Sequence, residues 1–251
     1  MKAILLSAGH GRRLLPMTAE TPKCLLDIHG STVLEWQIDH LMENGIDDIT
    51  VVVGYGAEKV EALLEKRYNP QQVRTLYNPF FDVTDNLATV WMARAEMTGD
   101  FVLLNGDTLF EPAVLCRLLD SPSRPITLAR DHKPRYDSDD MKVCLDGDRL
   151  LRIGKDLEAG NIDGESVGML LFRGQGGSLF KEAVERSMRS PVALKQWYLS
   201  VIDQLASQGH VWSRSVNGLQ WGELDYPVDL DRALKMVAGW LADEEERVLA
   251  V

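Results

Sequence analysis

The sequence predicts an α/β protein in which a mixed central sheet lies between two layers of helices, with antiparallel hairpins added in the second half. Three observations predict this fold. Apolar strand patterns alternate with helix patterns over residues 1–120, as in a mostly parallel sheet covered on both faces. Tight-turn signatures between strand patterns follow in the second half. No stretch rich in Pro, Gly or Ser divides the 251 residues, so we expect a single domain.

The first half supplies the predicted parallel strands and their helices. An apolar strand over 2–7 leads into a long loop over 9–23, which contains glycines and prolines and has no apolar periodicity. Thr32 and Glu35 have the spacing of a capping box, which predicts a helix that ends at Gly45. Further strands are expected over 49–53, 73–77 and 101–104, and further helices over about 57–67 and 86–97. This order predicts a Rossmann-like three-layer α/β/α architecture.

Two hairpins and three helices are expected in the second half. The turns are Asp146-Gly147 and Asn217-Gly218, because these residue pairs adopt the positive φ angles that a two-residue turn needs. The strands that they join are predicted over 141–145 with 149–153, and over 211–216 with 219–224. The helices are predicted over 177–189, 194–208 and 228–241.

Composition excludes several classes of protein. The net charge of -11, from 27 Lys and Arg against 38 Asp and Glu, disfavours nucleic acid and anionic membrane surfaces as partners. The longest apolar runs, 49–53 and 169–172, are far shorter than the ~18–20 residues of a membrane span. The N-terminus lacks a signal-peptide core, so we expect a cytoplasmic protein. The three cysteines are unclustered, which excludes a disulfide framework and a CxxC metal site.

Familiar nucleotide and hydrolase motifs are absent or incomplete. The segment from Gly9 begins like G-x-G-x-x-G, but Leu14 stands where the third glycine belongs. The chain has no GxxxxGK[ST] phosphate loop and no HExxH. Residues 164–168 match G-x-S-x-G, but a polar turn precedes them and an apolar strand follows, whereas a nucleophile elbow needs a strand and then a helix.

Cations and acids nevertheless indicate a site for phosphates. The loop after the first strand combines glycines, which let backbone N–H groups approach a phosphate, with Arg12, Arg13 and Lys23. Asp107 follows one apolar strand and Asp225 follows another. Ligands of α/β proteins bind at such strand ends, and two carboxylates there can hold one Mg²⁺ together with substrate phosphates. The alternative is that each aspartate only caps a strand end or a turn.

A resemblance to a known family is carried by the same residues. Residues 5–26, LLSAGHGRRLLPMTAETPKCLL, resemble the G-x-G-x-R-(about nine)-P-K signature of the sugar-phosphate nucleotidyltransferases, which have a GT-A-like fold. These enzymes join a nucleoside triphosphate to a phosphorylated small molecule and release pyrophosphate. The similarity continues through 85–91, 103–110, 152–172 and 221–233.

Within that family, the chain is most similar to the cytidylyltransferases that activate phosphocholine, inositol 1-phosphate or phosphonates. Three features carry this similarity: the short chain, the segments IGKDL and ELDYPVDL, and Asn86, which stands where sugar-activating members usually have glycine. The resemblance therefore implies CTP as the nucleotide, Mg²⁺ as the cofactor and a small phosphorylated or phosphonate acceptor. The sequence leaves the identity of the acceptor and the oligomeric state open.

The resemblance also implies roles for individual residues. Arg13 and Lys23 would act on the nucleotide phosphates, Asp107 and Asp225 would bind the metal, and Lys155 would meet the acceptor's phosphate. The implied nucleotide contacts are Leu6, Ala8, Gly9, Gly11, Asn78 and Asn86. For several of these residues the sequence leaves a structural alternative: Asn78 as a turn residue before Pro79, Asn86 as a helix N-cap and Lys155 as a surface side chain.

The acceptor pocket is expected in the second half, where acids and aromatic rings could hold a cationic head group. The candidates are Asp131, Tyr136, Glu165, Trp197, Tyr198 and Trp221. We thus expect one domain over 1–251, with a nucleotide-binding half (1–120), an acceptor-binding half (121–230) and a closing helix with an acidic tail (228–251).

The expected reaction is attack by the acceptor's phosphate or phosphonate oxygen on the α-phosphorus of CTP, with loss of pyrophosphate. No general base is required, because that oxygen is already ionised near neutral pH. One alternative is a UTP- or dTTP-dependent sugar-1-phosphate nucleotidyltransferase. Another is a nucleotide-sensing subunit without catalysis. A GT-A glycosyltransferase would need a DxD motif, and Asn105-Gly106-Asp107 is not one.

Overall fold

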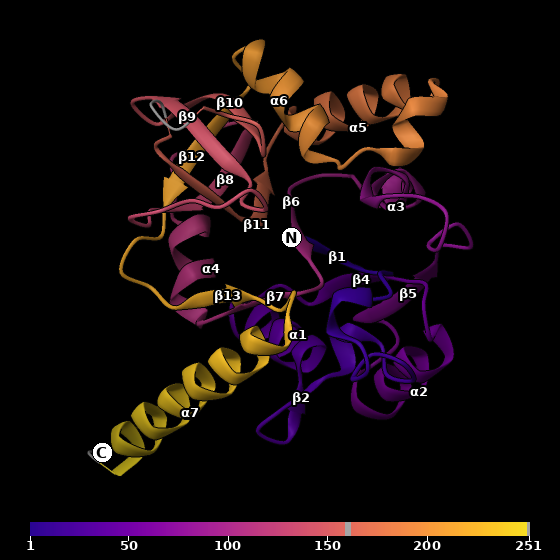
Figure 1. Cartoon of the computed structure of the whole chain (residues 1–251), viewed down its shortest axis with the longest axis vertical. Coiled ribbons are helices and arrows are strands. Elements are labelled where there is room, and N and C mark those ends of the chain that lie inside the picture. The colour runs from indigo at the N-terminus through magenta and orange to yellow at the C-terminus, as the bar shows by residue number, and fades with distance from the viewer. Residues whose placement is uncertain (159–161, 250–251) are drawn as a thin grey trace.

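The computed structural model describes residues 1–158 and 162–249, and it is built around one nine-stranded mixed sheet (Figure 1). Four parallel strands come from the first half, in the order β5-β4-β1-β6. Their bounds are Val73–Tyr77 (β5), Asp48–Val53 (β4), Lys2–Ser7 (β1) and Phe101–Asn105 (β6). The predicted strands of the first half are therefore confirmed, which puts the loop over 9–23 at the carboxyl end of β1.

The second half extends the same sheet from the free edge of β6, in the order β11-β8-β12-β10-β9. β11 runs antiparallel to both β6 and β8, whereas β12 runs parallel to β8. The bounds are Gly164–Phe172 (β11), Ile126–Asp131 (β8), Val211–Ser215 (β12), Arg149–Gly154 (β10) and Lys142–Asp146 (β9). The predicted G-x-S-x-G segment lies wholly inside β11, so no nucleophile elbow is formed.

Helices cover both faces of the sheet. Successive residues of a strand point to opposite faces, so Ile4 enters one apolar core while Ala3 and Leu5 enter the other. The first core includes side chains of α3 (Asn86–Met92), α5 (Gly176–Ser187) and α6 (Leu199–Ser207). The second includes side chains of α1 (Val33–Glu43), α2 (Ala57–Arg67) and α4 (Pro112–Leu119). The three-layer α/β/α prediction is confirmed.

The capping box that predicts α1 is present in the structure. The Thr32 hydroxyl accepts from the backbone N–H of Glu35 at 3.2 Å, and the Glu35 carboxylate accepts from the backbone N–H of Thr32 at 2.7 Å. These two bonds satisfy backbone donors that a helix start leaves unpaired. Thr32 also belongs to a two-stranded sheet of β2 (Asp27–Ile28) and β3 (Ser31–Thr32), which precedes the helix.

The hairpin around Asp146-Gly147 is confirmed, but the hairpin around Asn217-Gly218 is wrong. β9 and β10 pair antiparallel as expected. β12, however, has β8 on one side and β10 on the other, so neither of its edges is free for the following strand. That strand, β13 (Trp221–Glu223), instead pairs with β7 (Thr108–Phe110) in a separate two-stranded sheet.

The last helix, α7 (Pro227–Leu249), returns to the first half of the chain. Ala233 and Val237 pack with Leu14, Ile28 and Leu109 in a third apolar cluster. Figure 1 shows the C-terminal end of α7 extending away from the rest of the chain. Residues 250–251, the end of the predicted tail, lie outside the described residues. In the part of the chain that the structure describes, no helix is long and apolar enough to cross a membrane.

Candidate active site

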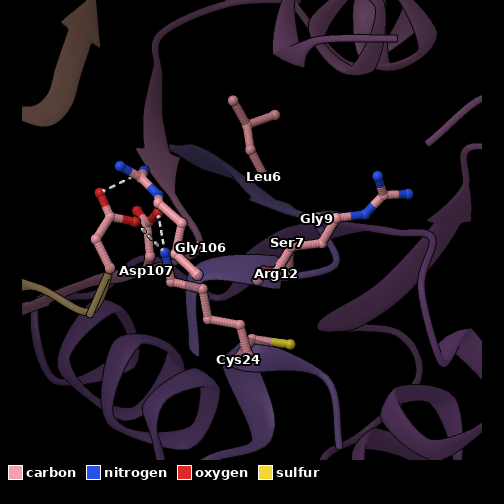
Figure 2. Close-up of a pocket in the computed structure, with 11 residues that line it drawn as sticks. Leu6, Ser7, Gly9, Arg12, Cys24, Gly106 and Asp107 are labelled. Atoms are coloured by element: carbon pink, nitrogen blue, oxygen red, sulfur yellow. Dashed lines mark hydrogen bonds and ion pairs between the residues drawn. The ribbon is translucent and has the colours of Figure 1, made fainter. Parts of the chain in front are cut away.

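The loop after β1 folds back on itself and carries two cations to the sheet edge. Gly11 has a φ of +67°, and a Cβ on it would lie 3.0 Å from the Cβ of Lys23. The Thr18 hydroxyl donates to the Gly11 carbonyl at 2.8 Å and closes the turn. A glycine therefore fits this position better than any other residue. The loop places Arg13 and Lys23 against a cavity of about 290 Å³ at the carboxyl ends of β1 and β6 (Figure 2).

Lys23 joins the two predicted metal-binding carboxylates. Its Nζ donates to Asp107 Oδ2 at 2.8 Å and to Asp225 Oδ1 at 2.7 Å. Burial works against the charge of Lys23, but attraction to Asp107 and Asp225 outweighs it, and the pKa of the ammonium is raised. Asp225 reaches this position because β13 pairs with β7, just beyond Asp107: the Leu224 N–H donates to the Asp107 carbonyl at 3.1 Å.

The two arginines of the loop have different surroundings. Arg13 Nη2 lies 2.8 Å from Asp225 Oδ2, and Arg13 Nη1 lies 3.1 Å from Asp139 Oδ2 and 3.2 Å from the Tyr226 hydroxyl. Arg12 pairs with Asp82 and is directed away from Asp107 in Figure 2. Arg13, and not Arg12, therefore shares the centre with Lys23.

The carboxylates fit a magnesium ion. Both bind the same Lys23 ammonium, so one cation can reach both. Asp107 Oδ1 is buried and has no hydrogen-bond partner among the described residues, which leaves a hard oxygen donor unused. The described residues contain no group of three or more His, Cys, Asp or Glu that could hold a metal. Mg²⁺ needs no such group, because it commonly uses one or two carboxylates together with substrate phosphates.

A second cavity, of about 240 Å³, lies beside the first and is lined by several of the residues expected to contact the nucleotide. Leu6, Ala8 and Gly9 line it at the end of β1, and Asn86 lines it from the start of α3. Asn86 Oδ1 accepts from the backbone N–H of Tyr198 at 2.9 Å, so a contact with a base would come from the N–H groups of its Nδ2 amide nitrogen. The N-cap of α3 is Asp85, so the alternative role of Asn86 as the N-cap is excluded.

Asn78 does not reach that cavity, in contrast to the expectation from the resemblance. It is fully buried, its Oδ1 accepts from the Phe80 N–H at 2.9 Å, and its Nδ2 donates to the Thr89 hydroxyl at 3.1 Å. Both ends of the amide are used inside the protein, and the bond from Phe80 closes a turn across Pro79. The structure therefore favours the turn role for Asn78, and Thr89 is the residue that lines the cavity.

A third cavity, of about 490 Å³, borders Asp225 and is strongly acidic. Glu165 forms an ion pair of 2.8 Å with Lys133, but its burial raises the pKa of the carboxyl to about 7. Burial and the nearby charges of Asp107 and Asp225 raise the pKa of Glu223 to about 8. Glu223 is not among the residues predicted from the sequence. Its position two residues before Asp225, at the end of the same predicted apolar strand, was an available signal.

Several predicted acceptor-binding residues lie outside this cavity, and two of them, Asp131 and Tyr198, are bound within the protein. Asp131 accepts from the Trp221 indole N–H at 2.9 Å and from the His132 backbone N–H at 2.7 Å, so it orients Trp221 instead. Tyr198 is fully buried, and its hydroxyl donates to Asn105 Oδ1 at 3.1 Å. Trp221 does line the cavity.

The remaining candidates lie around the cavities. The Lys155 ammonium is 3.3 Å from Asp139 and 4.3 Å from the centre of the Trp197 ring. The Trp197 side chain lines the second cavity and is partly exposed. The Tyr136 hydroxyl bonds His132 Nδ1 at 3.1 Å, outside the residues that line the acidic cavity.

Comparison with protein families identifies the family of the chain. A model described as the MobA-like NTP transferase domain matches residues 3–215, which include all the described site residues except those after β12. The chain belongs to the MobA-like NTP transferase family. Solved structures agree in fold: an inositol-1-phosphate CTP transferase from T. maritima has a TM-score of 0.80 at 20% identity, with 94% of each chain covered. A CTP:phosphocholine cytidylyltransferase from Streptococcus pneumoniae has a TM-score of 0.77 at 20% identity, covering 94% of this chain and 98% of that one.

Sequence relatives of this NTP transferase domain include longer proteins. CMP-5'-(3-aminopropyl)phosphonate synthase of Streptomyces rubellomurinus is 30% identical over 93% of this chain, which corresponds to 38% of the relative. Choline-phosphate cytidylyltransferase of Streptococcus pneumoniae is 37% identical over 44% of this chain and 47% of its own length. The chain thus spans half or less of the length of these relatives, and the resemblance stated from the sequence is confirmed at the level of family and fold.

Proposed function

We propose that this chain is a cytidylyltransferase that joins CTP to a small phosphorylated or phosphonate acceptor and releases pyrophosphate. One observation carries the proposal: Lys23 and Arg13 meet Asp107 and Asp225 between a nucleoside-sized cavity and an acidic cavity. The names of the two sequence relatives, one a CMP-phosphonate synthase and one a cytidylyltransferase, support the choice of nucleotide and acceptor class.

The residues of this centre suit a reaction between two anions. Arg13 and Lys23 place positive charge where the triphosphate and the acceptor would meet, and so offset their repulsion. Asp107 and Asp225 would hold Mg²⁺. When bound, Mg²⁺ neutralises phosphate charge and orients the reacting groups. The attacking oxygen needs no base, and accordingly the residues of the described centre include no histidine.

The acidic cavity supports an acceptor with a cationic group. Glu165 and Glu223 lie in it with Trp221 and Tyr226. An ammonium group bound there would favour the ionised form of both carboxyls and would lie against the aromatic faces. Glu223 and Tyr226 were not expected from the sequence. They take the place of Asp131 and Tyr198, which are bound to Trp221 and Asn105 instead. Phosphorylated or phosphonylated amines are the acceptors that combine both required charges.

The test is pyrophosphate release from each of the four NTPs, crossed with phosphocholine, aminoalkylphosphonates, inositol 1-phosphate and hexose 1-phosphates. We expect CTP with an amine-bearing acceptor to have the highest kcat/KM. A tenfold preference for UTP or dTTP with a hexose 1-phosphate would favour the sugar-activating alternative. Tight CTP binding without pyrophosphate release from any pair would favour the nucleotide-sensing alternative.

A further inference from the structure

Three donors from distant parts of the chain converge on the carboxylate of Asp139. Its Oδ2 accepts from Arg13 Nη1 at 3.1 Å and from the Tyr226 hydroxyl at 2.8 Å, and its Oδ1 accepts from Lys155 Nζ at 3.3 Å. Arg13 follows β1, Lys155 follows β10 and Tyr226 precedes α7. The same contacts lower the pKa of Asp139, Tyr226 and Lys155 contributing first. A carboxylate held by two cations and a hydroxyl occupies an anion-binding site.

The segment that carries Asp139 is held together by its own bonds. Residues 132–141 connect β8 to β9. Within them, Asp137 Oδ1 accepts from the backbone N–H groups of Asp139 at 2.8 Å and Asp140 at 3.2 Å, and Asp140 Oδ2 accepts from the Asp137 N–H at 2.7 Å. These local bonds do not involve the three donors. The three donors are therefore additional ties between the segment and the rest of the chain, and these ties are lost when the Asp139 side chain leaves.

Asp139 also stands where a negative charge opposes the proposed reaction. It borders the acidic cavity beside Asp225, and two of its three partners are cations that the site would offer to a phosphate. The Asp139 carboxylate and an incoming phosphate cannot both accept from the same donors. Their negative charges would also repel each other if both lay in this site. In the proposed reaction Asp225 would bind the metal, whereas no step of that reaction needs the Asp139 carboxylate.

We propose that Asp139 is an internal substitute for the acceptor's phosphate or phosphonate group, which displaces it from Arg13, Lys155 and Tyr226 on binding. This inference rests on the proposed function for the nature of the ligand. A phosphate offers three acceptor oxygens and nearly two charges, against two oxygens and one charge for the carboxylate. Anions that form fewer bonds than Asp139 leave it in place, so Asp139 selects for phosphate and phosphonate groups.

The first test measures binding of inorganic phosphate to the full chain by calorimetry, without nucleotide or metal. Asp139→Asn removes the competing charge, and Asp137→Asn is the matched control, since it removes one charge from the same segment and keeps an acceptor oxygen for its turn. If Asp139 occupies the site about 90% of the time, Asp139→Asn should tighten phosphate binding about tenfold. The control should change it by less than twofold.

Two results would overturn the proposal. Equal gains in both variants would mean that only the general charge of the cavity matters, and weaker or undetectable binding by Asp139→Asn would mean that Asp139 merely orders the donors. Circular dichroism of both variants checks that they are folded. Because phosphate binding needs neither CTP nor turnover, a failure of the proposed function in the NTP screen would leave this result to be judged separately.

Hydrogen exchange gives a second, independent readout. Displacement predicts that the backbone amides of 132–141 exchange faster in the wild-type chain when inorganic phosphate is bound, although ligands usually slow exchange. Phosphate should have a smaller effect on Asp139→Asn, because the two cations hold a neutral amide less strongly than a carboxylate. Slower exchange of 132–141 on phosphate binding would overturn the proposal, because the segment would then close over the anion instead of leaving it.

Discussion

Lys23 connects the groups on which the proposed chemistry depends. In this structure its ammonium lies between Asp107 and Asp225, the two carboxylates that would bind the metal. A cation between two acids prevents their mutual repulsion in the absence of metal and nucleotide. Arg13 adds a second cation beside Asp225, and Asp107 Oδ1, which has no hydrogen-bond partner among the described residues, remains free to bind a further cation.

Asp107→Asn should reduce turnover about 100-fold or more at saturating Mg²⁺, in line with the loss of a charge-stabilising group worth ~3 kcal/mol. The measurement is pyrophosphate release. Removal of Mg²⁺ by a chelator should abolish the wild-type activity. Asp82→Asn is the control, because Asp82 pairs with Arg12 away from the centre. Wild-type turnover of Asp107→Asn would contradict the metal assignment.

Lys23→Ala and Lys155→Ala should have separate kinetic effects. Lys23 lies in the first cavity with Gly9 and Gly11, so its loss should weaken the use of CTP. Lys155 binds Asp139, the proposed substitute for the acceptor's phosphate, so its loss should mainly raise the KM of the acceptor. Steady-state kinetics with each substrate varied in turn distinguishes the two. Normal acceptor KM with defective CTP use in Lys155→Ala would reverse the assignment.

Glu165 should make stability depend on pH. Burial raises its pKa from the ordinary 4.5 to about 7 in the folded state, so between these values the folded chain keeps a proton that the unfolded chain has lost. The free energy of unfolding therefore falls as pH rises from about 4.5 to about 7. Urea titrations should show a shallower fall for Glu165→Gln. Glu182→Gln, at an exposed position on α5, should leave the wild-type slope unchanged.

At the scale of elements, close approach of β1 and β6 builds the floor of the centre. Gly106 follows β6, and its backbone N–H donates to the Leu6 carbonyl at 3.1 Å. A Cβ at this position would lie 2.5 Å from the Ser7 hydroxyl oxygen and 2.6 Å from the Leu6 carbonyl oxygen. Both distances are too short for non-bonded atoms. Asp107 is thus held beside the loop after β1 only while residue 106 has no side chain.

Gly106→Ala should therefore destabilise the chain by roughly 1–3 kcal/mol, the usual effect of overpacking, and lower turnover because Asp107 must shift. Gly154→Ala is the matched control: this glycine also ends a strand, but a Cβ there would meet nothing within 4 Å. Urea unfolding and pyrophosphate release measure the two effects. Equal behaviour of the two variants would contradict the role given to the contact between β1 and β6.

At the scale of the whole molecule, the two halves share one sheet, and both contribute residues to the candidate active site. β11 pairs with β6, and each of the two large apolar cores includes residues of both halves. β13 and α7 then return from the second half to pack on the first. Asp107 and Asp225 are adjacent because of this return, although 118 positions separate them in the chain.

This arrangement predicts one cooperative unfolding transition for residues 1–251, as expected for a single domain. Urea unfolding followed by circular dichroism and by tryptophan fluorescence should give coincident curves. Fluorescence reports on both halves, since Trp36 and Trp91 lie in the first and Trp212 and Trp221 in the second. Two separated transitions would show that the halves are independent domains.

The sequence by itself determined what depends on local interactions. Strand patterns, the capping box at Thr32 and the glycines of the loop after β1 act over a few residues, so each can be recognised without knowing the fold. The cations and aspartates of the centre could likewise be proposed from strand ends and from the family motif. The sequence could not show which strands pair, because pairing depends on which edges other strands already occupy.

Tertiary structure decided which strands pair and which side chains are buried. Asn217-Gly218 has the local signature of a hairpin, yet β8 and β10 occupy both edges of β12, and β13 pairs with β7 instead. The same packing buries Asn78, turns Tyr198 toward Asn105 and brings Glu223 toward the aspartates. Burial and long-range pairing depend on the free energy of the whole assembly, and they are not properties of any short segment.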